Sequence, residues 1–373
     1  MENNLSVRHR IPLLIAGFAS LFFASFIGLL RMGISIPFHI SPSQIALHGP
    51  LMVCGFLGTV ISMERAVALG RLWAYLGPIA AAMGALSLIF GFNQPFGIGL
   101  ITLASLTLSM ASIQVVIKQR EWFSFLLFLA ALSWLVGCLL WFRSHPLGQV
   151  VPWWIGFLVI TIAAERLELS RFLRPSRLNK GLLLGFIFLL GLSLVLMTTG
   201  SLSNFRLMAL TLFLMAAWLL KNDVVRITIK QHGLTRYIAV ALIAGYLWLL
   251  VASLIGLSTT TLLPASSYDA FIHAIFLGFG FSMIFGHALV IFPAIVKIQI
   301  PFNVSFYLPL FTLHLSMVLR MIGDFLYLPH LRQFGGALNM FSIIFFIIVV
   351  LLAVIIDKLQ KNSAHAETGD LNG

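Results

Sequence analysis

Charged residues are scarce in this 373-residue chain, since 9% of the residues are Asp, Glu, Lys or Arg and 60% are hydrophobic. About a quarter of the residues of a soluble domain are charged, so the composition excludes a soluble catalytic domain. The chain has only two cysteines, Cys54 and Cys138, and both lie in apolar runs, which supports neither a disulfide framework nor a cysteine zinc site. No glycine-rich phosphate loop follows a strand, and no strand is apparent. These absences favour a single membrane domain over residues 1–373.

Twelve segments of the chain are apolar and long enough to form membrane-spanning helices, which need about 20 residues each. The breaks between them carry turn chemistry, such as Asn93-Gln94-Pro95. The predicted spans are residues 11–30, 46–69, 72–92, 96–117, 122–142, 150–169, 181–199, 204–221, 236–258, 268–298, 303–328 and 333–357. The sequence therefore predicts an all-α polytopic membrane protein.

Positive charge is unevenly distributed over the loops of this twelve-span topology. With the N-terminus inside, one side of the membrane receives eighteen of the 23 Lys and Arg residues and the other side receives four. Cytoplasmic loops carry such an excess, so we expect a bacterial inner-membrane protein with both termini in the cytoplasm. The net charge of +12 is then explained by the topology of the protein in the membrane. Its expected partners are anionic membrane lipids, and no nucleic acid is implied.

An internal repeat relates the second, sixth and tenth predicted helices. The second reads GFLGTVISMERAVAL from Gly55, and the sixth reads GFLVITIAAERLEL from Gly156, at an offset of 101 residues. The tenth helix matches the second at an offset of 225, which pairs His48 with His273 and Gly55 with Gly280. The sequence thus predicts three pseudo-repeated four-helix units, roughly residues 11–117, 122–221 and 236–357.

The repeat-matched histidines suggest a metal or haem site. Helices two and ten run in the same direction, so we expect His48 and His273 at one depth, near the outer face. Gly55 and Gly280 lie two turns further on and would share the histidine face, as would His287. Neutral imidazole is a good ligand for metals and for haem iron, and glycine would admit a ring edge. Interhelical hydrogen bonding beside packing glycines is the alternative.

The segment HGPLMVCGF from His48 resembles the second helix of haem-copper oxidase catalytic subunits, where a His-Gly-x-x-Met run ligates the low-spin haem. The twelve helices and threefold pseudo-repeat are similar to that fold. HAIFLGFGFSMIFGHALVIFPAIV from His273 also resembles the NnrS family, compact bacterial haem- and copper-containing membrane proteins linked to nitric oxide. These resemblances imply a b-type haem held by His48 and His273, with copper as a further candidate.

Four more polar residues inside the predicted membrane region are functional candidates, because ionisable groups are costly there. His287 and His314 lie on antiparallel neighbours and would meet, either to bind copper or a second haem or simply to form hydrogen bonds. Arg320 and Asp324 are four residues apart and are expected to pair. Beside a haem, Arg320 would instead hold a propionate.

Two Glu-Arg pairs, Glu64-Arg65 and Glu165-Arg166, recur at the inner ends of helices two and six. Their repetition favours a structural ion-pair network, and a proton entry point is the alternative. No adjacent His-His pair occurs in the chain, so the second metal of an oxidase active site is not expected.

These observations together predict an integral membrane haem-binding protein with a role in redox or nitric oxide and oxygen chemistry. An electron-donor protein or a quinol would then be a partner. Whether it is an enzyme stays open. One alternative is a secondary transporter of a small solute, since many have twelve helices and internal repeats. Another is a non-catalytic sensing or assembly protein.

Overall fold

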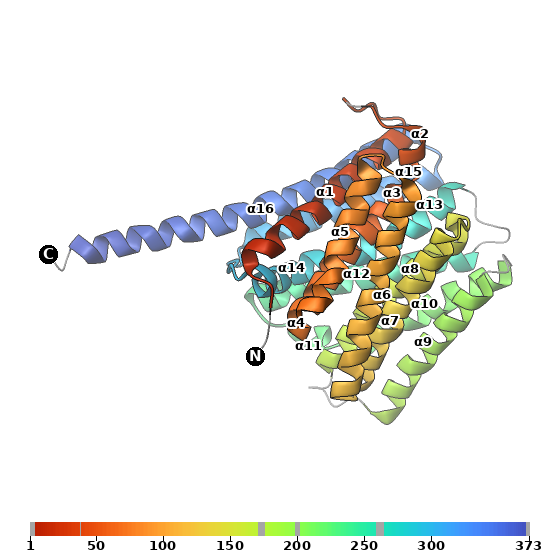
Figure 1. Cartoon of the computed structure of the whole chain (residues 1–373), viewed down its shortest axis with the longest axis horizontal. Coiled ribbons are helices and arrows are strands. Elements are labelled where there is room, and N and C mark those ends of the chain that lie inside the picture. Colours follow the sequence, from red (N-terminus) through yellow and green to blue (C-terminus); the bar gives the residue numbers. More distant parts are fainter. Residues whose placement is uncertain (1–3, 38, 171–175, 198–201, 259–264, 371–373) are drawn as a thin grey trace.

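The computed structural model describes residues 4–37, 39–170, 176–197, 202–258 and 265–370. In these ranges it contains helices and no strand. The π- and 3-10-helical elements are labelled η (Figure 1). The elements are α1 (Val7–Arg31), α2 (Pro42–Ile45), α3 (His48–Pro50), η1 (Leu51–Leu57), α4 (Gly58–Leu69), η2 (Leu72–Tyr75), α5 (Leu76–Ile89), α6 (Gln94–Gln119), α7 (Trp122–Phe142), α8 (Leu147–Ser170), α9 (Arg177–Met197), α10 (Leu202–Asn222), α11 (Val225–Thr228), α12 (Gly233–Ser258), α13 (Ala265–His273), η4 (Ala274–Phe281), α14 (Ser282–Val296), η5 (Val304–Phe306), α15 (Tyr307–Phe325) and α16 (Pro329–Asp370).

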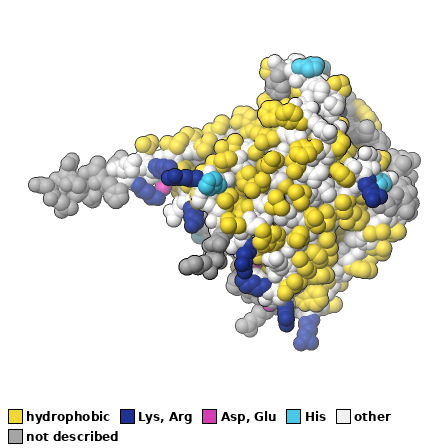
Figure 2. All heavy atoms as spheres, viewed as in Figure 1, with side chains coloured by type: hydrophobic (Ala, Val, Ile, Leu, Met, Phe, Trp, Pro, Cys, Tyr) yellow, Lys and Arg dark blue, Asp and Glu magenta, His cyan; other side chains and the backbone are white. Residues whose placement is uncertain are grey.

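Twelve helical stretches of the described chain are long and apolar enough to cross a membrane. They coincide with the twelve predicted spans, with ends shifted by a few residues, so the predicted all-α polytopic fold is confirmed. The division into three four-helix units stays a prediction. Large apolar side chains such as Phe188, Phe311 and Ile355 are exposed on the flanks, and Figure 2 shows the hydrophobic surface of one flank. A surface of this kind requires lipid around it, and the protein is a multi-pass membrane protein.

The helices differ in how deeply they lie in the bundle. In α8, 72% of the most apolar stretch is buried inside the protein, against 28% in α9 and in α16. Helix α8 contacts α7, α9, α10 and η4, so it is central. Helix α16 has 42 residues, which at about 1.5 Å per residue is twice the thickness of a hydrocarbon core of about 30 Å. It therefore projects beyond the bundle, as Figure 1 shows.

Turn chemistry sets several helix ends, and the predicted break at Asn93 is one of them. Asn93 caps α6, because its side chain accepts a hydrogen bond from the backbone N–H of Phe96 at 3.2 Å. Gly70 ends α4 in the left-handed conformation, with φ of 64°, which glycine adopts without strain. These ends fix where each span starts and stops.

Two of the spans are interrupted by π-helix. One span consists of α3, η1 and α4, and the other of α13, η4 and α14; both η1 and η4 are π-helical. Each π segment begins within three residues of a repeat-matched histidine, His48 or His273. Such segments are rare and occur frequently at functional sites. The two spans run in the same direction because seven complete spans separate them in the chain.

Candidate functional site

The two repeat-matched histidines face one another between these spans. Their ring centroids are 6.1 Å apart and the ring planes are inclined by 27°. His48 is the first residue of α3 and His273 is the last residue of α13. The expected closeness of the two rings is thus observed, while their common depth near the outer face stays a prediction.

Hydrogen bonds fix the orientation of both rings. His48 Nδ1 lies 2.7 Å from the backbone oxygen of Ala24 on α1, and His273 Nδ1 lies 2.7 Å from the backbone oxygen of Asp269. A carbonyl oxygen can only accept, so each Nδ1 carries the proton and each Nε2 keeps its lone pair. Among the described residues, neither Nε2 has a hydrogen-bond partner. A second partner that fixes the tautomer is the usual arrangement of a metal-binding histidine.

A cavity of about 170 Å³ adjoins both rings. Most of its wall is apolar, and it is contributed by α1, η1, η4 and α16 among others. Its polar wall includes three arginines, Arg31, Arg320 and Arg332, and one carboxylate, Asp269. Three methionines also line it, namely Met32, Met52 and Met340. The pocket therefore combines two free imidazole nitrogens, flexible thioethers and an excess of positive charge.

The predicted glycine stripe does not face this cavity, and that prediction is wrong. A Cβ on Gly55 would lie 2.0 Å from Ser20 Oγ, and one on Gly280 would lie 3.1 Å from Leu158. These glycines pack against α1 and α8 instead. The reason is the π-helix, because one extra residue in a turn rotates the following residues by about 100°.

Because of this rotation, the residue that faces the opposite span lies one position after the predicted glycine in each span. Phe56 and Phe281 lie eight residues after the two histidines, and their rings stack with centroids 6.0 Å apart and an interplanar angle of 20°. The glycines that do line the cavity are Gly28, Gly49 and Gly336. A Cβ on Gly28 would lie 2.9 Å from the ring of His48, so this glycine makes room for the imidazole against α1.

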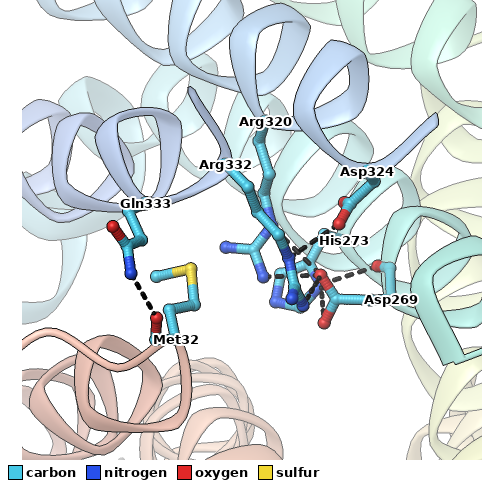
Figure 3. Close-up of polar contacts among 7 residues, drawn as sticks. All are labelled: Met32, Asp269, His273, Arg320, Asp324, Arg332 and Gln333. Atoms are coloured by element: carbon cyan, nitrogen blue, oxygen red, sulfur yellow. Dashed lines mark hydrogen bonds and ion pairs between the residues drawn. The ribbon is translucent and has the colours of Figure 1, made fainter. Parts of the chain in front are cut away.

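A network of two arginines and two aspartates lies beside His273 (Figure 3). Arg320 Nη2 donates to Asp269 Oδ2 at 2.8 Å, and Arg332 Nη2 is 3.3 Å from the same oxygen. Arg332 Nε is 2.7 Å from Asp324 Oδ1. The predicted Arg320–Asp324 pair is therefore wrong, since Arg332 at the start of α16 takes Asp324 and Arg320 reaches across to α13. Asp269 is a further residue of this site that was not among the predicted site residues, although it precedes His273 by four residues and so shares its helix face.

His287 and His314 have other partners. Arg166 Nη2 lies 2.8 Å from His287 Nε2, and His287 Nδ1 is 2.7 Å from the backbone oxygen of Met283. A guanidinium only donates, so it uses the lone pair that a metal would need. Trp248 Nε1 donates to His314 Nδ1 at 3.0 Å. The described contacts give no support to a copper or second haem site at these two residues.

Glu64 and Glu165 line one small cavity of about 10 Å³ together with Arg65, Ser112 and Thr161. That is close to the space of a single water molecule. None of the ion pairs formed by the described residues involves either glutamate. The predicted ion-pair network is thus absent from the described contacts, although the fold does bring the two glutamates to one cavity.

The fold and the pocket define a class, polytopic helical membrane proteins with a paired-histidine pocket between two π-containing spans. Residues 10–355 match the family model described as a domain of unknown function (DUF8744), and the chain belongs to that family. No curated protein is similar enough to this chain to count as a relative.

Proposed function

We propose that this protein binds a haem between the α3–η1 and α13–η4 spans, with His48 and His273 as the axial ligands. The observation that supports this most is the pair of closely spaced imidazoles whose Nε2 atoms have no hydrogen-bond partner among the described residues. The b-type haem that the resemblance to haem-copper oxidases implies is the form we propose.

The spacing of the rings suits one metal ion between them. In a linear Nε2–metal–Nε2 arrangement, two metal–imidazole bonds of about 2.0–2.1 Å, with each ring centre about 1.1 Å behind its nitrogen, would separate the ring centres by about 6.3 Å. The observed separation is 6.1 Å. Direct hydrogen bonding between the two rings would require one Nε2 to carry a proton, whereas both Nδ1 atoms already donate to carbonyl oxygens.

The side chains that line the cavity suit the chemistry of a porphyrin, but the open volume is smaller than a porphyrin needs. A porphyrin is larger than the roughly 170 Å³ now open, so side chains must move. The three methionines of the wall are suited to this, because methionine has three rotatable bonds and adapts to irregular shapes. Arg320 lines the cavity beside His273, and a guanidinium there would bind a haem carboxylate, as would Arg31 and Arg332.

Bound in this way, the iron would supply one-electron redox chemistry, tuned by its axial ligands and their hydrogen bonds. The protein residues hold the two Nε2 atoms in place, neutralise the carboxylates and keep the pocket largely apolar. A redox role, including nitric oxide or oxygen chemistry with an electron-donor protein or quinol as partner, is the function we propose.

We further propose the bacterial inner membrane as its location, with both termini cytoplasmic. The support is the distribution of positive charge, since eighteen of 23 Lys and Arg residues fall on one side of the twelve-span topology. In Figure 2 most of the visible Lys and Arg lie along the lower-left margin, on the side of the two termini in Figure 1. The histidine pocket would then lie near the periplasmic face.

An optical spectrum of the protein purified from haem-replete cells tests the proposal. We expect a Soret band in the wild type, its loss in His48→Ala and in His273→Ala, and its retention in His330→Ala, a control at an exposed histidine on α16. Wild-type protein without the band, or both pocket variants with an unchanged band, would refute haem binding at this site.

Copper is the second candidate. Thioether and imidazole ligands together favour Cu(I), and three methionines line the cavity that the two histidines share. Elemental analysis of the same preparations decides between the two. Copper in stoichiometric amount, absent from His48→Ala and accompanied by no Soret band, would favour a copper site.

A further inference from the structure

The two histidines of the pocket differ in what their Nδ1 atoms contact. His48 Nδ1 lies 2.7 Å from a neutral acceptor, the backbone oxygen of Ala24. His273 Nδ1 lies 2.7 Å from the backbone oxygen of Asp269 and also 3.4 Å from the carboxylate Oδ1 of the same residue. Among the residues that the structure describes, His273 therefore has a carboxylate behind its imidazole and His48 does not.

The position of this carboxylate is fixed from the other direction. Its Oδ2 accepts hydrogen bonds from Arg320 Nη2 at 2.8 Å and from Arg320 Nε at 3.3 Å. Arg332 Nη2 is 3.3 Å away. Asp269 thus bridges α13 to α15 and α16, with one oxygen toward the arginines and the other toward His273 (Figure 3). A carboxylate held in this way cannot turn away from the imidazole without breaking the ion pair with Arg320.

A carboxylate near the Nδ1–H group of a metal-binding imidazole increases the electron donation of Nε2 and fixes the ring. Stronger donation favours the higher oxidation state of the bound metal. We propose that Asp269 is a positioning residue that stabilises the oxidised state of the haem iron through His273, and that Arg320 holds it in place. This inference rests on the proposed haem site.

Replacing Asp269 by Asn should therefore raise the midpoint potential. Loss of a partner behind a metal ligand typically changes metal affinity 10- to 100-fold. If the change falls on the oxidised state, a tenfold loss corresponds to a rise of 59 mV for one electron. The matched control is Asp324→Asn, which removes the same charge from the same network but has Arg332 as its partner and makes no described contact with His273.

The experiment is a spectroelectrochemical titration of full-length protein containing haem b, as wild type, Asp269→Asn and Asp324→Asn. We expect the Asp269→Asn potential to rise by about 59 mV or more and the Asp324→Asn potential to rise by clearly less. A second variant, Asp269→Glu, keeps the charge but displaces the carboxylate, and should shift the potential in the same direction by less than Asn does. It decides the question if Asp269→Asn fails to retain haem.

The outcomes separate the two proposals. Equal shifts in Asp269→Asn and Asp324→Asn would show a general charge effect and overturn the role of Asp269, while the haem site stands. An unchanged potential in Asp269→Glu would overturn it as well. Wild-type protein that binds no haem b would overturn the haem site and this inference together.

Discussion

Gly28 of α1 makes a sharp test of the pocket, because it determines how closely the His48 ring can lie against that helix. An added Cβ would lie 2.9 Å from His48 Cε1 and 3.2 Å from Nδ1. Carbon atoms prefer about 3.5–4.0 Å, so in Gly28→Ala the ring must retreat by about 0.6 Å. The acceptor of its hydrogen bond, the Ala24 oxygen, is on the same helix at 2.7 Å. The retreat would stretch that bond to about 3.3 Å, beyond the usual limit of about 3.2 Å.

Two effects should follow in Gly28→Ala. The haem-free protein should lose about 1–3 kcal/mol of stability from overpacking, measured by thermal unfolding in detergent. Haem affinity should fall about 10- to 100-fold, because the partner that orients a ligand is lost. The affinity is measured by titrating haem-free protein with hemin and following the Soret band.

The matched control for Gly28→Ala is Gly17→Ala. It makes the same substitution on the same helix, but its Cβ would lie 3.4 Å from Thr59 and 3.9 Å from the backbone oxygen of Gly55, both ordinary contact distances. It should therefore remain within about 0.5 kcal/mol of the wild type and bind hemin as the wild type does. If Gly28→Ala and Gly17→Ala bind hemin equally tightly, His48 does not ligate the iron in the position described here.

Two further predictions concern the fold alone. Gly84→Ala should lower the free energy of unfolding by about 1–3 kcal/mol, because its Cβ would lie 2.8 Å from the backbone oxygen of Gly97. Gly99→Ala is the control, since the nearest atom is 3.6 Å away, and it should leave the melting temperature nearly unchanged. Equal losses of stability in the two variants would contradict the α5–α6 packing. Burial raises the pKa of Asp223, the residue directly after α10, above its ordinary 3.8, so the folded state holds this proton more tightly and stability should fall as the pH rises from below 4 through the folded-state pKa. Asp223→Asn should show a flatter dependence of melting temperature on pH, and an identical dependence would contradict this.

The sequence predicted the spans and the histidine pair well, because each depends on a local or a repeated signal. Twenty apolar residues between turn residues leave few alternatives to a spanning helix. The offset of 225 residues that relates His48 to His273 placed them on equivalent helices, and the structure brings their rings within 6.1 Å. Both inferences used only spacing along the chain.

The ion-pair partners of the arginines could not be predicted from spacing along the chain. Arg320 has Asp324 one turn away on its own helix, which made that pair the simplest prediction. The choice of Asp269 depends on how α13, α15 and α16 pack, and on Arg332 entering from the next helix to take Asp324. Likewise His314 accepts from Trp248 on α12, a contact for which no sequence spacing gives a signal.

The prediction of a glycine stripe was wrong because of the π-helix in the two spans. The prediction assumed 3.6 residues per turn from histidine to glycine, whereas both spans contain π-helix in that interval. A single insertion in only one span would have rotated one set of side chains away from the other. Because both spans contain it at matching positions, the facing set moves from the glycines to Phe56 and Phe281, which stack at 6.0 Å. The two spans therefore share the departure from regular α-helix as well as the matched histidines, so the phenylalanines that follow face one another just as the histidines do.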